Sequence, residues 1–448
     1  MRTLASFFII LSCAVVAQAA DVAVTVYNNN LGVISETRSL EIKKGTNRLA
    51  FTDVPALIDA ASVRVELPGG KNKLTILEQN YAFDLVGPEQ MYQKYIDEQI
   101  EIVDEDGKLY TGKLLAFNGG AITLLDASGK VKIVSASKVT EVNFPALPDG
   151  LITRPTLFWL YNSSADGKQD IRVGYQTSGL SWNAEYVGVL NEAETSLGLS
   201  GWSSINNQSG KTYENATLKL IAGDISRAQD QLIIRGGRAK EVALSAMAPG
   251  FEEKQFFEYH MYTLPRKATV ADKEIKQLSL FDPATSAVKK VYMYKPEENI
   301  KQVAVVVEFK NSQQTGLGMP LPAGRVRLFK ADTDGSMVLL GEDLIDHTPK
   351  DEKVDLKVGY AFDIAAEERL MSHKSISDRV EEREYEIEFR NHKKEAVTIS
   401  VEKKLWGTFE ILTTNFQHKR KDANTMTFDV PVSADQTAVV KYKVRITN

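Results

Sequence analysis

The side chains that most often bind metals or transfer protons are few in this chain and far apart. The five histidines are each at least nineteen residues from the next. Zinc sites built on one helix place two histidines four residues apart, so this spacing excludes such a site. The single cysteine, Cys13, excludes a disulfide framework, an iron–sulfur cluster and the zinc modules that use several thiolates. We therefore predict no metal ion and no cofactor, and we expect solvated histidines at His260, His347, His373, His392 and His418.

Short motifs of nucleophilic and phosphate-binding sites are matched only in part. Residues 135–138 and 400–403 both match S-x-x-K, a motif that needs a helix start to bring serine and lysine together. Both segments have strand-like sequence. Residues 210–212 match the end of a phosphate-binding loop, but Ile205 stands where its first glycine belongs. These motifs therefore predict no catalytic residue.

The acidic residues do not predict a calcium site or a catalytic site either. Residues 332–335, Asp-Thr-Asp-Gly, begin like a calcium loop, but the glycine comes two residues early and no glutamate closes the loop. A hairpin turn explains the four residues better. Two carboxylates that cleave a glycosidic bond leave no linear signature, so a hydrolase with a site assembled from distant residues stays open as an alternative.

Four aromatic residues lie close together in the most distinctive part of the chain. Tyr175, Trp182, Tyr186 and Trp202 could present flat rings on which a sugar stacks. Tryptophans of β-sandwich proteins often fill the core instead, and we favour that interpretation for Trp182 and Trp202. A ligand platform formed by the four rings is the alternative.

The first residues resemble a secretory signal peptide. Arg2 is followed by an apolar run over residues 7–16 and then by Ala17-Gln18-Ala19, an A-x-A cleavage pattern. The run is shorter than the roughly 20 residues that a membrane-spanning helix needs. We expect cleavage after Ala19, with Ala17 and Ala19 as the signature residues, and a periplasmic or secreted chain without a membrane span. An uncleaved anchor and lipidation at Cys13 are the alternatives.

The composition and net charge of the chain limit the kinds of partner that it can bind. The 448 residues are 43% hydrophobic and 25% charged, with a net charge of −5. These values are typical of soluble globular proteins and suit several domains. Binding to a nucleic-acid backbone needs an uncompensated basic surface, so we predict no nucleic-acid partner.

Most of the chain shows the alternating pattern of β-strands. Residues 326–342 contain two β-rich runs on either side of the Asp-Gly turn and predict a hairpin. Helical patterns are few. Pro88 begins one that extends through residues 88–100, and residues 364–370 give a weaker one. Many short strands and few helices predict a mainly β fold.

The pattern divides the chain into several units. Five short strands with tight turns over residues 99–144 predict a small barrel of the SH3 or Sm type. The expected organisation is a signal peptide (1–19), N-terminal strands of a central β domain (20–85), a helix plus the small barrel (86–146), a central β-sandwich (151–345) with a mobile excursion (227–255), and an immunoglobulin-like β-sandwich (350–448).

Residues 175–186 (YQTSGLSWNAEY) and 199–224 (LSGWSSINNQSGKTYENATLKLIAGD) resemble the bacterial family catalogued as domain of unknown function 4139. The resemblance extends in order over nearly all of the chain after residue 19, including residues 27–42, 78–85 and 321–363. It implies secretion and a β-rich fold, but no activity and no catalytic residue.

Three functions agree with these observations. The first is a non-enzymatic protein of the cell envelope that binds a protein partner through strand edges and loops. The second is a binding module for envelope glycan, and the third is the hydrolase named above. Oligomeric state is not predicted.

Overall fold

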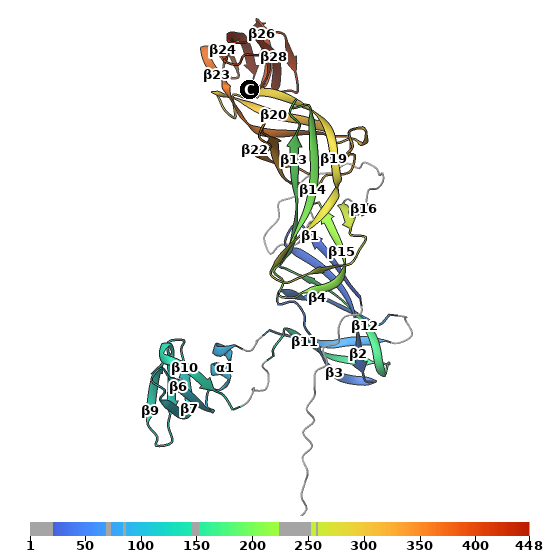
Figure 1. Cartoon of the computed structure of the whole chain (residues 1–448), viewed down its shortest axis with the longest axis vertical. Helices are drawn as coiled ribbons and strands as arrows, with labels where there is room; N and C mark the ends of the chain where they lie inside the picture. Colours follow the sequence, from blue (N-terminus) through green and yellow to red (C-terminus); the bar gives the residue numbers. More distant parts are fainter. Residues whose placement is uncertain are drawn as a thin grey trace, which may run out of the picture.

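The computed structural model describes residues 21–68, 73–83, 87–145, 152–223, 252–256 and 259–447. These residues are mainly β, as expected, and most of them form a long rod (Figure 1). The predicted cleavage residues Ala17 and Ala19 lie outside the described residues, as does most of the predicted excursion at 227–255. No helix among the described residues is long and apolar enough to cross a membrane.

One end of the rod contains two sheets. In the described part of the chain, the larger sheet has the order β16-β17-β15-β1-β2-β12-β4, with β18 paired to β15, and the smaller has the order β3-β11-β5. The alternating hydrophobic pattern of the sequence matches the burial of these strands. In β1, Val22, Val24 and Val26 are buried, and the residues between them are more exposed. The strands are β1 (Asp21–Tyr27), β2 (Leu31–Ile42), β3 (Gly45–Thr52), β4 (Ile58–Glu66), β5 (Leu74–Ala82), β11 (Thr156–Ser163), β12 (Gly167–Thr177), β15 (Tyr213–Ala222), β16 (Glu252–Phe256), β17 (Tyr259–Thr263) and β18 (Ala268–Val270).

A larger sheet extends along the rest of the rod. Its main path, within the described ranges, is β22-β21-β13-β14-β19-β20-β23-β24-β29-β26, and β25, β28 and β27 branch from β19. The strands are β13 (Leu180–Leu190), β14 (Ser196–Asn207), β19 (Glu274–Tyr294), β20 (Gln302–Lys310), β21 (Gly324–Ala331), β22 (Met337–Ile345), β23 (Lys353–Ser377), β24 (Val380–Asn391), β25 (Val397–Lys404), β26 (Thr408–Thr414), β27 (His418–Arg420), β28 (Thr425–Val432) and β29 (Gln436–Thr447). A short 3₁₀-helix, η2 (Gln313–Thr315), follows β20.

Three strands, β19, β20 and β23, connect two hydrophobic cores. The first core includes Trp182 and Leu356, and the second includes Tyr294 and Ile364. β19 has 21 residues. Its residues 274–287 pair with β14, and its last residues pair with β20 and β25. β23 likewise contributes residues to both cores. Because the strands continue from one core to the next, the second core is not confined to residues 350–448.

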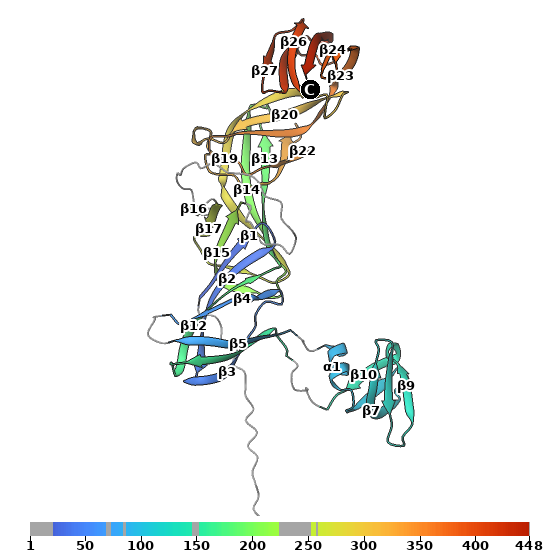
Figure 2. The same cartoon turned by 180° about the vertical axis from the view of Figure 1, so that it is seen from behind.

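The residues between β5 and β11 form a separate small unit (Figure 2). Within that unit, the sheet order is β10-β6-β7-β8-β9 and α1 packs against it. Pro88 stands in the first turn of α1, as predicted, but the helix ends at Lys94. The elements are α1 (Pro88–Lys94), β6 (Gln99–Asp104), β7 (Leu109–Phe117), β8 (Ala121–Leu125), β9 (Val131–Ser135), the 3₁₀-helix η1 (Ala136–Lys138) and β10 (Val139–Asn143).

Two local predictions have clear outcomes. The hairpin expected at residues 326–342 is confirmed, because β21 and β22 are antiparallel and Gly335 of the turn has a φ of +83°. The helix expected at residues 364–370 is wrong, since these residues belong to β23. Its backbone pairs with β24 in this segment, and Ile364 and Ala366 are buried in the second core. At the end of the predicted excursion, residues 252–256 form β16.

Candidate functional site

The four aromatic residues considered as a ligand platform do not share one surface. Tyr175, Trp182 and Tyr186 are buried in the first core. Their polar atoms donate hydrogen bonds inside the protein: the Tyr175 hydroxyl to Glu36 Oε1 (3.0 Å), Trp182 Nε1 to the Ile221 carbonyl (2.9 Å) and the Tyr186 hydroxyl to the Pro322 carbonyl (2.7 Å). Trp202 on β14, expected in the core, is 41% exposed.

The two S-x-x-K matches do not pair serine with lysine. Ser400 and Lys403 are three residues apart in β25, and side chains so placed point to opposite faces of a strand. Lys403 forms ion pairs with carboxylates. Lys138 pairs with Glu105 at 2.7 Å.

Lys211, from the partial phosphate-loop match, lies in a buried ionic cluster. Its Nζ contacts both Glu36 carboxylate oxygens at 3.2 Å and donates a hydrogen bond to the Asp53 carbonyl at 2.7 Å. Arg38 also contacts both oxygens, its Nη2 lying 2.9 Å from Oε1 and 3.0 Å from Oε2 of Glu36. Burial lowers the pKa of Lys211, although Glu36 opposes this effect. The cluster joins the loop before β15 to β2 and has the geometry of a structural contact.

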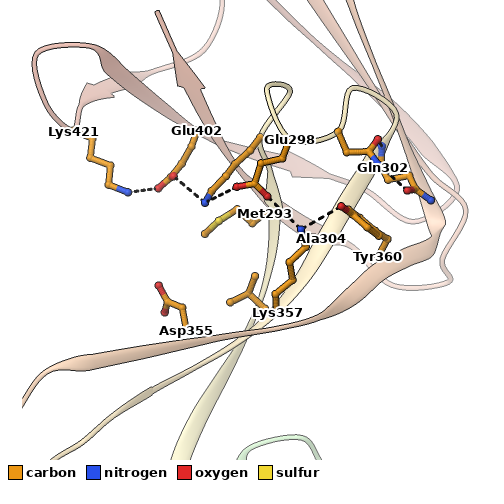
Figure 3. Close-up of a pocket in the computed structure, with 12 residues that line it drawn as sticks. Met293, Glu298, Gln302, Ala304, Asp355, Lys357, Tyr360, Glu402 and Lys421 are labelled. Atoms are coloured by element: carbon orange, nitrogen blue, oxygen red, sulfur yellow. Dashed lines mark hydrogen bonds and ion pairs between the residues drawn. The ribbon is translucent and has the colours of Figure 1, made fainter. Parts of the chain in front are cut away.

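A pocket of about 210 Å³, lined by several charged residues, lies between the two cores (Figure 3). Its walls come from the end of β19 and the loop after it, from β20, β23 and β25, and from the residue that follows β27. We call it the junction pocket. The lining residues are Met293, Lys295, Glu298, Asn299, Gln302, Ala304, Val306, Asp355, Lys357, Tyr360, Glu402 and Lys421.

Alternating charges line one side of the junction pocket, each contacting the next (Figure 3). Lys421 pairs with Glu402, and Lys295 lies 3.7 Å from Glu402 and 3.3 Å from Glu298. Lys357 Nζ then lies 3.3 Å from the other oxygen of Glu298 and donates a hydrogen bond to the Tyr360 hydroxyl at 3.2 Å. Asp355 faces this row and pairs at 2.9 Å with Lys353.

The ion pairs hold these side chains in their charged forms. Burial alone would raise the pKa of Glu298, but hydrogen bonds from Lys357 and Lys295 outweigh it and lower that pKa below 4.5. Hydrogen bonding to the Tyr360 hydroxyl, and then to Glu298, raises the pKa of Lys357. A proton-transfer catalyst needs a pKa near the working pH, so this pairing suits binding better than acid–base catalysis.

Replacing Lys357 by methionine is expected to raise the pKa of Glu298. The charged pair stabilises the fold above pH 4.5, and its contribution is lost as the pH falls through the lowered pKa. A carboxyl-carbon NMR titration measures the midpoint of Glu298. Lys404→Met is the control, because Lys404 packs over Trp406 instead. Equal midpoints in wild type and Lys357→Met would contradict the pairing.

A groove of about 250 Å³ lies beside β22 and β23. Val305 and Val307 of β20 line this groove, whereas Ala304 and Val306, which alternate with them, line the junction pocket. The remaining lining residues are Leu190, Glu194, Lys290, Tyr292, Leu340, Val358, Gly359, Tyr360, Ala361, Phe362, Asp363 and Lys393.

Sequence reasoning missed both hollows. The junction pocket is assembled from residues up to 128 positions apart, Met293 to Lys421, so no linear spacing reveals it. One feature of the sequence does point to the groove. Four consecutive apolar residues, 337–340, follow the hairpin turn, and such a run is unusual in an exposed strand. Within the described ranges, no group of three or more His, Cys, Asp or Glu side chains could hold a metal ion.

Comparison with known proteins identifies one region. Residues 24–118 match the family model described as an N-terminal domain of unknown function, DUF4140. The match extends from β1 through β7, the second strand of the small unit, and it includes residues 27–42 and 78–85. No curated protein matches the chain. The matched model is DUF4140 and not family 4139, so the expected resemblance to family 4139 stays a prediction over the whole chain.

Proposed function

We propose that the protein is an exported, non-enzymatic binding or scaffolding component of the cell envelope. The observation that carries this proposal is an exposed apolar patch on the rod, at the edge of its largest sheet. Export rests on the signal-like residues 1–19. The three strands that run through both cores, β19, β20 and β23, support a scaffolding role, because they connect the two cores without an intervening loop.

The patch consists of Met337, Val338, Leu339 and Phe362, and we call it the edge patch. It covers both faces of the sheet edge, because Val338 points to the face opposite Met337 and Leu339. The three β22 side chains are each about half exposed, and Phe362 on β23 is fully exposed. Phe362 and Leu340, the residue after Leu339, both line the groove, so patch and groove are continuous. A cluster of exposed apolar side chains beside a groove is typical of a binding site.

An extended polypeptide segment fits this surface best. β22 pairs with β21, and along the described chain no other strand pairs with it. Its second half is covered by β23, where the Lys357 amide donates to Asp343 Oδ2 at 2.6 Å. The first half, Met337 to Leu340, leaves backbone groups at the sheet edge that a partner strand can bind. An apolar side chain of that strand would enter the groove next to Phe362.

We also propose that the chain consists of two β-sandwiches and an inserted small barrel. The order β10-β6-β7-β8-β9, with η1 between β9 and β10, supports an inserted small barrel of the SH3/Sm type. The two cores support a central β-sandwich followed by an immunoglobulin-like sandwich. In this arrangement the edge patch lies on β22, an edge strand of the central sandwich, and on β23, one of the strands that join the two sandwiches.

Peptides selected from a random library on the immobilised full chain test the patch. We expect proline-poor, apolar peptides whose affinity falls at least about tenfold in Phe362→Asp, because a buried aromatic anchor dominates such interfaces. Trp406→Asp is the matched control, since Trp406 is another exposed aromatic residue, 70% exposed, outside the patch. No selected peptide, or peptides that bind Phe362→Asp as well as wild type, would refute the proposal.

A further inference from the structure

We propose that the junction pocket binds one neutral sugar ring, either free or as the terminal unit of a glycan. This proposal goes beyond the partner surface described above and does not rest on it. The edge patch uses backbone groups and apolar side chains, whereas the junction pocket offers polar side chains around a small apolar floor.

The charges of the lining residues favour a neutral ligand. Three lysines and three carboxylates line the pocket, so their formal charges cancel. Lys295 and Lys357 are both held by Glu298, and Lys421 is held by Glu402. An anion would have to displace one of these carboxylates from its lysine, and a cation would have to displace one of the lysines or Lys353, the partner of Asp355. A hydroxyl group need not, because it donates to a carboxylate and accepts from an ammonium group without changing either charge.

The uncharged lining residues suit the two sides of a sugar ring. Gln302 accepts a hydrogen bond from Asn299 Nδ2 at 2.8 Å through its Oε1, which leaves its amide group as a donor toward the ligand. Met293, Ala304 and Val306 supply the apolar floor on which the C–H face of a ring can pack. Tyr360 adds an aromatic side chain that is 40% exposed.

The size and place of the pocket agree with a small ligand. Its volume of about 210 Å³ is below the roughly 300–1,000 Å³ of pockets that take drug-sized molecules, so one ring is the appropriate size. Ligand sites occur preferentially where two structural units meet, and this pocket lies where β19, β20 and β23 pass between the cores.

Saturation-transfer NMR and calorimetry on the full chain test this site. The probes are methyl β-glucoside and methyl N-acetyl-β-glucosaminide, each also offered as the terminal unit of its trisaccharide. We expect at least one sugar to bind with a dissociation constant of about 1 mM, unchanged between low and high salt because the ligand is neutral. Equal binding of ring and trisaccharide indicates a glycan end, and binding of the ring alone indicates a free sugar.

Two variants and two charged probes give the controls. Asp355→Asn is expected to weaken binding about tenfold, since it removes a charged acceptor. Asp429→Asn should not change it, because Asp429 is likewise an exposed strand carboxylate next to one lysine but lies outside the pocket. Lysine and glutamate should not bind. The proposal is overturned by no sugar binding at roughly ten times the expected constant, by equal affinity in Asp355→Asn, or by tighter, salt-sensitive binding of a charged probe.

Discussion

Replacing Glu36 by glutamine is expected to lower the free energy of unfolding by about 3–5 kcal/mol, because it leaves two buried cations without their shared carboxylate. The side chains of Glu36, Arg38 and Lys211 are 1%, 5% and 8% exposed. The substitution keeps the shape of residue 36 and removes only its charge. Denaturant unfolding of the full chain, followed by tryptophan fluorescence, measures the effect.

Two further variants separate the charge effect from a general loss of packing. Adding Lys211→Met to Glu36→Gln removes one of the two stranded cations, so the double variant should be more stable than the sum of the single costs predicts. Asp435→Asn is the surface control. Its partner Lys394 is 89% exposed, and such pairs contribute at most about 1 kcal/mol. A cost for Glu36→Gln as small as that of the surface control would show that the cluster does not support the fold.

The fold class could be predicted because alternation is a local property. Residues 326–342 carry both strands and the turn of the β21–β22 hairpin, and residues 99–144 carry every strand of the small unit. The prediction of a helix at residues 364–370 was wrong because non-local contacts determine the structure of this segment. Ala-Ala-Glu-Glu-Arg-Leu has good helix formers, but pairing with β24 and burial of Ala366 in the second core favour the strand.

The junction pocket and the buried ionic cluster could not be predicted in the same way. The junction pocket depends on how β19, β20, β23 and β25 lie beside one another, and no short stretch of sequence encodes that arrangement. The buried cluster has a partial signal, since Glu36 and Arg38 alternate with the polar residues Ser35 and Thr37 in a strand and so share one face. Lys211 lies 175 residues after Glu36, and nothing in the sequence around it indicates that it joins this cluster.

Replacing Trp182 by alanine is expected to destabilise the protein by about 3–5 kcal/mol, the usual cost of removing a large buried ring. Trp182 has no exposed surface, lies in the first core and packs edge-on against Tyr262, with ring centroids 6.2 Å apart. The lost hydrogen bond from Nε1 to the Ile221 carbonyl adds to the cost.

Trp202→Ala is the matched control, because Trp202 lies on β14, the strand paired with β13 of Trp182, and is 41% exposed. We expect it to cost about 1 kcal/mol or less. Thermal and denaturant unfolding of both variants give the comparison. If Trp182→Ala unfolded like wild type but lost affinity for a sugar, the ring would act in binding rather than in the core. The expected result is the reverse: Trp182→Ala loses stability, and Trp202→Ala keeps both stability and the affinity of the junction pocket.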